Sequence, residues 1–265
     1  MDEYIIEGIS NGGSKNSLNQ DACFAGKTKA KGSEVVFAAV CDGMGGMKSG
    51  ELASATIIEE ARNWFYSKCD LEENWVISEE EIVDEWRTLL IKCNERIIKY
   101  GNDNGIRLGS TSAFVLLWGG KVLVSNVGDT RVYEIPENGK MRRLSMDHSV
   151  VGKEIASGKL TEEEAKKDKR NNILTQCVGF YPQIDPYFYL GNTPDKGMYL
   201  ITSDGFYNKV NNDEIVETLN FRICNTGETI SNSLKDLVIR DRNRGERDDI
   251  TVVAVRVDSV LKESI

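Results

Sequence analysis

The amino-acid sequence predicts an α+β fold, in which strands and helices follow one another in blocks. Strand-like runs succeed each other over residues 112–135, whereas helical periodicity extends over residues 49–100 and again over residues 213–240. The block of strands contains a two-glycine turn typical of an antiparallel hairpin, which argues against a doubly wound parallel sheet. Since the chain has only four prolines and no low-complexity linker, we expect residues 1–265 to form a single domain.

The first half of the chain shows one buried strand followed by two helices. Residues 35–41 are a continuous apolar run, which is typical of a strand buried on both faces. After a glycine-rich turn, apolar residues recur at helical spacing over residues 49–66. The clearest helix is predicted over residues 78–100, where Ser78 and Glu81 form a capping-box signature and Gly101 is expected to end it.

The second half begins with short strands and a polar segment. Three strands are predicted at residues 112–118, 121–127 and 131–135, and Gly119-Gly120 forms the turn between the first two. Residues 145–180 are polar and lysine-rich, with a short helix starting at Thr161, and we expect them to form a mobile flap. The remaining predicted elements are a strand at 198–202, helices at 213–219 and 228–240, and a final strand at 250–257.

Composition excludes several classes of protein. The net charge of −9 argues against a nucleic-acid partner, which would require a basic face. The six cysteines are scattered without any Cys-x-x-Cys pair, which argues against structural zinc and favours a reducing compartment. The N-terminus has no signal-like stretch, and no segment approaches the ~20 apolar residues of a membrane span. We therefore expect a cytoplasmic protein with no membrane partner.

Aspartates at the ends of apolar runs are the main chemical signal. Asp42, Asp204 and Asp248 each stand at such an end, beside turn-forming residues or another aspartate, and Asp129 has a similar setting. A carboxylate at the end of a buried strand is costly unless a positive charge compensates it. Four such residues, far apart in sequence but alike in setting, suggest one site that holds hard divalent cations such as magnesium or manganese.

Other sites of phosphate chemistry fit the sequence poorly. The turn after Asp42 resembles a phosphate-binding loop, but Met47 precedes Lys48 and the glycine spacing is wrong. No cysteine has the arginine six residues later that a cysteine phosphatase needs. The only histidine is His148, which leaves a serine hydrolase or a zinc hydrolase without its base or its ligands. A hydrolytic site here would be built from carboxylates, hard metals and water.

Six motifs, in order along nearly the whole chain, resemble those of the metal-dependent protein phosphatase family, also called the protein phosphatase 2C family. Each motif alone is weak, but six in order with plausible spacing are specific, and Met44 makes the turn similar to bacterial-type members. The motifs are Asn19-Gln20-Asp21-Ala22, Val40-Cys41-Asp42-Gly43-Met44-Gly45-Gly46, Gly109-Ser110-Thr111 with Asn126-Val127-Gly128-Asp129-Thr130-Arg131, residues 144–149, Ser203-Asp204-Gly205 and Asp248-Asp249-Ile250-Thr251.

The resemblance implies a central antiparallel β-sandwich flanked by α-helices on both outer faces, with a binuclear metal centre at one edge. Two Mn²⁺ or Mg²⁺ ions per chain would be bound, with a third, weaker site. Asp42 would bridge the two ions, the carbonyl of Gly43 would bind one, and Asp204 and Asp248 the other. Asp129 together with Asp204 would favour the third ion, and Asp21 would act through water.

The resemblance also implies a reaction and its partners. Water between two dications gives hydroxide at neutral pH, which would attack phosphorus in line, without a phosphoenzyme. The expected activity is hydrolysis of phosphoserine and phosphothreonine in proteins, and we expect a monomer whose partners are phosphoprotein substrates. The alternative is a catalytically impaired relative that acts as a binding or regulatory module.

Departures from the family pattern keep that alternative open. Gln20 stands where the family has an acidic residue, and Asn208 where it has a further acidic one. Asn16 stands where relatives often have a phosphate-binding arginine, and the adjacent Lys15 could replace it only as a point charge. Both are candidate residues for binding the substrate phosphate. Met44 replaces a candidate general acid, so protonation of the leaving group falls to water.

Overall fold

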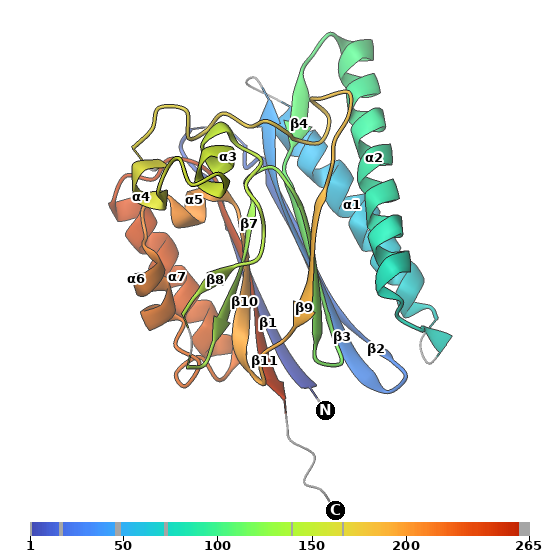
Figure 1. Ribbon diagram of the computed structural model, residues 1–265, viewed down its shortest axis with the longest axis vertical. Coiled ribbons are helices and arrows are strands. Elements are labelled where there is room, and N and C mark those ends of the chain that lie inside the picture. The colour runs from blue at the N-terminus through green and yellow to red at the C-terminus, as the bar shows by residue number, and fades with distance from the viewer. Residues whose placement is uncertain are drawn as a thin grey trace, which may run out of the picture.

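Two antiparallel sheets lie face to face at the centre of the molecule (Figure 1). The computed structural model describes residues 2–15, 18–45, 49–71, 74–138, 140–165 and 167–259. The first sheet has the order β1 (Asp2–Asn11), β11 (Ile250–Ser259), β10 (Lys196–Thr202), β7 (Arg131–Pro136) and β8 (Arg142–Arg143). The second has the order β2 (Asp21–Ala30), β3 (Ser33–Gly45), β5 (Ser112–Trp118), β6 (Lys121–Val127) and β9 (Tyr187–Asn192), and β4 (Leu108–Ser110) pairs with the end of β3.

Helices cover both outer faces of this sandwich. Helices α1 (Gly50–Cys69) and α2 (Glu79–Asn104) lie on the second sheet, whereas α6 (Asn212–Thr218) and α7 (Gly227–Asn243) lie on the first, next to the short α5 (Asp204–Tyr207) (Figure 1). Helices α3 (Val150–Ala156) and α4 (Glu162–Ala165) lie near one end of the sandwich. The predicted α+β sandwich with helices on both sides is confirmed. None of the described helices is both long and apolar enough to span a bilayer.

Strand β3 shows how the sequence forms three apolar layers. Alternate residues of the predicted run, such as Phe37 and Cys41, face the cluster under α1 and α2. The residues between them, such as Val36 and Val40, face the cluster between the two sheets. A third cluster, which includes Phe206 and other residues, fills the space between the first sheet and α5–α7. The strand is therefore buried on both faces, as predicted.

Two glycine-containing turns connect strands in different ways. Gly119 and Gly120 have φ values of 49° and 78°, which confirms the hairpin turn between β5 and β6. The next connection, residues 128–130, leaves β6 in the second sheet and enters β7 in the first. Gly128 has a φ of 98°, and the side chain of Thr111 would lie 2.6 Å from any Cβ there. Glycine is thus required where the chain crosses between sheets, directly before Asp129.

The prediction that Gly101 ends the second helix is wrong. Helix α2 continues to Asn104 and ends at Gly105, which takes the left-handed conformation at a φ of 63°. Gly101 is buried inside the helix, where a Cβ would lie 2.8 Å from the carbonyl oxygen of Ile106. At the start of the helix, the side chain of Ser78 accepts from the amide of Glu81, as the capping signature predicts.

Candidate metal centre

Five acidic residues meet at one end of the sandwich. Asp21 is the first residue of β2 and pairs in register with Asp42 of β3, in the second sheet. Asp204 follows β10 and Asp248 precedes β11, both in the first sheet, while Asp129 lies in the crossover between the sheets. The two sheets therefore bring together residues that are distant in sequence, as the pattern of aspartates indicates.

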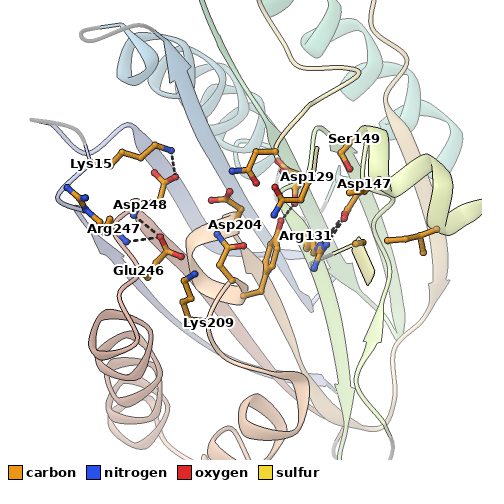
Figure 2. Close-up of a pocket in the computed structure, with 17 residues that line it drawn as sticks. Lys15, Asp129, Arg131, Asp147, Ser149, Asp204, Lys209, Glu246, Arg247 and Asp248 are labelled. Carbon is orange, nitrogen blue, oxygen red and sulfur yellow. Dashed lines mark hydrogen bonds and ion pairs between the residues drawn. The ribbon is translucent and has the colours of Figure 1, made fainter. Parts of the chain in front are cut away.

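Two adjoining cavities share three of these carboxylates. One, of about 470 Å³, is lined by Asp42, Gly43 and Gln20 together with the shared residues. The other, of about 320 Å³, extends toward α3 and is drawn in Figure 2. The side chains of Asp129, Asp204 and Asp248 line both spaces and lie in succession along the cavity in Figure 2. Lys15 and Asn172 also border both cavities.

Burial and mutual repulsion make the ionised carboxylates costly. Burial raises the pKa of Asp42 well above its ordinary range, and the charges of the other four aspartates raise it further. Burial, followed by the charge of Asp204, raises the pKa of Asp129 to about 8. Burial raises the pKa of Asp21 to about 7, and burial with the charge of Asp248 raises that of Asp204 to about 6. A cluster of this kind calls for a compensating positive charge.

Two buried carboxylate oxygens of the centre have no hydrogen-bond partner within the described residues. They are Oδ1 of Asp21 and Oδ1 of Asp204. The other oxygen of Asp21 accepts a 2.8 Å hydrogen bond from the hydroxyl of Ser203, which ties β2 to the end of β10. Because buried polar atoms are almost always satisfied, the two free oxygens indicate a ligand at this place.

The backbone around Asp42 is fixed by close packing. Its amide donates to Oγ1 of Thr111 at 2.9 Å, and its carbonyl accepts from the amide of Thr111 at 2.8 Å. A Cβ on Gly43 would lie 2.3 Å from the carbonyl oxygen of Gly50 and 2.4 Å from that of Gln20. Only glycine fits at position 43. Residues 43–45 continue β3 and pair with β4. The rest of the glycine-rich turn, residues 46–48, lies outside the described residues, so the rejection of a phosphate-binding loop stays a prediction.

The adjacent Asp248 and Asp249 have different surroundings. Both oxygens of Asp249 accept backbone amides, from Gly13 at 2.7 Å and from Gln20 at 2.8 Å. Asp249 is therefore occupied in holding the segment before β2. The Asp248 carboxylate lines the cavity and contacts Nζ of Lys15 at 2.6 Å. Of the pair, Asp248 lines the cavity, and its assignment as a ligand stays a prediction.

Lys15 lies at the mouth of the centre. Its amide and that of Ser14 donate to the carbonyl of Arg247, at 3.0 and 2.9 Å, which binds this segment to the one before β11. The hydrogen bond to Asp248 raises the pKa of Lys15, so its ammonium is charged. Asn16, the other candidate phosphate contact, lies outside the described residues.

His148 and Arg131 both have structural partners. Nδ1 of His148 accepts the amide of Gly128 at 3.2 Å, and the His148 amide donates to the carbonyl of Gly128 at 2.9 Å. His148 thus braces the turn that holds Asp129. Arg131 forms a buried ion pair with Asp147, with 2.6 Å between Nη2 and Oδ2.

The donor set fits a hard divalent cation. It consists of carboxylate and carbonyl oxygens, which magnesium and manganese prefer, and two of those oxygens are buried without partners. Within the part of the chain that the structure describes, no three acidic, cysteine or histidine side chains are gathered closely enough to enclose one ion. The carboxylate of Asp248 contacts Nζ of Lys15 at 2.6 Å.

The supporting roles of three residues near the carboxylates were not predicted from the sequence. Ser203 and Asp249 tie strand ends together, and Tyr207 donates to the carbonyl of Asp129. Of the three, only Tyr207 could have been linked to the site by its spacing in the sequence. It stands three residues after Asp204 in a short helix, a spacing that places two residues on the same side.

Comparison with known proteins agrees with this geometry. A family model described as protein phosphatase 2C matches residues 12–238. A protein phosphatase 2C-type protein of Streptococcus pyogenes serotype M6 is 31% identical over 251 residues, covering 93% of this chain and 95% of that protein. The serine/threonine phosphatase stp of Listeria monocytogenes serovar 1/2a is 28% identical over 227 residues, covering 84% of this chain and 85% of that protein.

Solved structures show the same architecture. A serine/threonine phosphatase of S. agalactiae superposes with a TM-score of 0.80 at 27% identity, covering 96% of this chain and 99% of that chain. The catalytic domain of the serine/threonine protein phosphatase PstP, solved in complex with two manganese ions, gives a TM-score of 0.77 at 22% identity, covering 97% and 100%. At this lower identity the likeness concerns the fold alone.

Proposed function

The chain belongs to the protein phosphatase 2C family, and we propose that it is a metal-dependent phosphatase of phosphoserine and phosphothreonine residues in proteins. The convergence of Asp42, Asp129, Asp204 and Asp248 on one cavity is the observation that supports this function most directly. The 31% identity over nearly the whole of a phosphatase 2C-type protein supports it independently.

The proposed centre holds two Mn²⁺ or Mg²⁺ ions through oxygen ligands. Asp42, the Gly43 carbonyl, Asp204 and Asp248 would hold them, with Asp42 common to both sites. Asp129 and Asp204 would hold a third, weaker ion, and Asp21 would act through water with Oδ1. Bound divalent cations lower the pKa of water to near neutrality and neutralise charge on the phosphoryl oxygens.

The chain's own side chains bind and orient the substrate. Lys15 is charged and borders both cavities, so it is placed to donate to a phosphoryl oxygen, next to Asn16. Met44 lines the cavity and has no proton to give, so the leaving group takes its proton from water. The proposed flap, residues 145–180, contributes Asn172 and Phe180 to the cavity wall and would limit access of water to the site.

The test is hydrolysis of a phosphothreonine peptide and of a small aryl phosphate, with and without manganese. We expect turnover that is lost in excess chelator and restored by manganese or magnesium, because an oxygen-only ligand set suits hard ions. Full activity in chelator after dialysis would refute the metal mechanism. Metal binding without any turnover of either substrate would identify the impaired relative instead.

A further inference from the structure

Tyr207 connects two of the candidate metal-binding segments directly. It is the last residue of α5, the four-residue helix that begins at Asp204. Its hydroxyl donates a 3.0 Å hydrogen bond to the backbone carbonyl of Asp129. A single side chain therefore links the helix of one carboxylate to the crossover turn of the other.

This link matters because nothing in the local chain path fixes the spacing of the two carboxylates. Asp129 and Asp204 belong to different connections of the chain, one between β6 and β7 and the other after β10. The hydrogen bond acts on the backbone of Asp129, so it fixes that spacing without using a carboxylate oxygen. In Figure 2 both acids lie on the cavity wall that Tyr207 helps to line.

The ring of Tyr207 is held in place by Arg131. The guanidinium carbon of Arg131 lies 3.8 Å from the centroid of the ring. Nε and Nη2 of Arg131 together make three contacts of 3.2, 3.1 and 2.6 Å with the buried carboxylate of Asp147. Nη1 of Arg131 donates to the hydroxyl of Tyr133 at 3.1 Å. Arg131 is therefore fixed on two sides and presents its flat face to Tyr207.

We propose that Tyr207 is a positioning residue, which keeps Asp129 and Asp204 at the spacing that a divalent cation needs, with Arg131 and Asp147 as its support. The proposal rests on the metal-dependent function above and deepens it. Groups that orient metal ligands affect metal affinity by about 10- to 100-fold when they are lost. Tyr207 acts through a backbone carbonyl and not on the ion itself, so we expect an effect near the lower limit.

The experiment compares Tyr207→Phe with Tyr199→Phe in the full chain. Both substitutions remove one tyrosine hydroxyl and its hydrogen bond, but Tyr199 bonds to Glu134 and only Tyr207 bonds to Asp129. The melting temperature is followed during a manganese titration, and binding is measured by calorimetry. We expect Tyr207→Phe to raise the dissociation constant for manganese about tenfold, whereas in chelator both variants should melt only roughly 2–4 °C below wild type, because each loses one hydrogen bond. Tyr199→Phe should bind manganese like wild type.

The outcomes separate this inference from the proposed function. A wild-type protein without any manganese-dependent shift would refute the metal centre itself. A wild-type shift that Tyr207→Phe reproduces at the same manganese concentration would overturn only the role of Tyr207. A melting temperature lowered equally with and without manganese would show a packing role instead. Turnover at saturating manganese supplies a further check, because a positioning defect should recover there toward the wild-type value.

Discussion

At the scale of residues, each carboxylate of the centre carries a negative charge that the surrounding protein does not compensate. Burial and like charges raise the pKa values of Asp42 and Asp204, to about 6 for the latter. We expect Asp42→Asn and Asp204→Asn each to abolish turnover, because an amide is a poor ligand for a hard dication. In chelator neither should lower the melting temperature, since each removes one repelling charge.

The measurements are turnover at saturating manganese and a thermal scan in chelator. Asp103→Asn is a suitable control, because this acid lies on the exposed side of α2 beside Lys99. Near wild-type turnover in either site variant would contradict the metal assignment. A melting temperature lowered by several degrees in chelator would instead assign these acids a structural role. Asp249 has such a role, because both of its carboxylate oxygens accept backbone amides.

The comparison of Asp248 with Asp249 shows what sequence can predict at this scale. The kinds of residues in the centre follow from their places at the ends of apolar runs. Their individual tasks do not, because adjacent aspartates are chemically identical until the backbone orients them. Asp249 faces two amides of the segment before β2, whereas Asp248 faces the cavity and Lys15. Only long-range contacts make this distinction.

At the scale of elements, Asp241 joins helix α7 to the segment after α5. It is fully buried, and its Oδ1 accepts from the amide of Lys209 at 3.2 Å, while its Oδ2 has no partner in the part of the chain that the structure describes. Burial raises its pKa from 3.8 to about 7. Because the folded pKa is the higher one, the folded state retains the proton, and wild-type stability falls as pH rises from about 4 to 7.

The stability of Asp241→Asn relative to wild type should therefore increase as pH rises, since an amide cannot ionise. We expect the melting temperature of this variant relative to wild type to be several degrees higher at pH 8 than at pH 5. Thermal scans of both proteins at the two pH values measure this difference. Asp236→Asn changes an exposed acid of the same helix and should show no such trend. An equal difference at both pH values would mean that Asp241 is ionised throughout.

Elements with a strong local pattern were predicted well, and those defined by pairing were not. Strands β5 and β6 have the predicted bounds, because apolar runs flank a two-glycine turn. Strand β9 was missed, since it is half-exposed and exists through its pairing with β6. Strands β1 and β2 were also missed, since they are defined by their pairing with β11 and β3. The other elements not predicted include α3, β4 and β8. The end of α2 depended on which glycine had room for a left-handed turn.

At the scale of the molecule, the centre exists only when both sheets are assembled. Asp21 and Asp42 belong to the second sheet, whereas Asp204 follows β10 and Asp248 precedes β11, two strands of the first. Contacts such as that of Ser203 with Asp21 hold the two edges together. An unfolded chain has no comparable site, so divalent cations should bind the folded state almost exclusively and shift the folding equilibrium toward it.

This preference predicts the response of the whole protein to manganese. At a concentration ~100 times the dissociation constant, each independent site should add about 2.7 kcal/mol to the free energy of unfolding. In a protein of this size, each kcal/mol moves the melting temperature by roughly 2–4 °C. Manganese should therefore raise it by roughly 5–10 °C for one tight site, and by more when a second site fills.

Asp248→Ala should reduce this rise, because it removes a ligand of one site while Asp42 and Gly43 retain the other. It also frees Lys15, whose ammonium then lies near Asp204 without its 2.6 Å partner and adds to the repulsion of a cation. Asp236→Ala, on the exposed side of α7, is the matched control and should keep the full rise. Thermal scans over a manganese series decide the matter. A wild-type curve that manganese does not move, or an undiminished rise in Asp248→Ala, would show that these aspartates do not form the metal site.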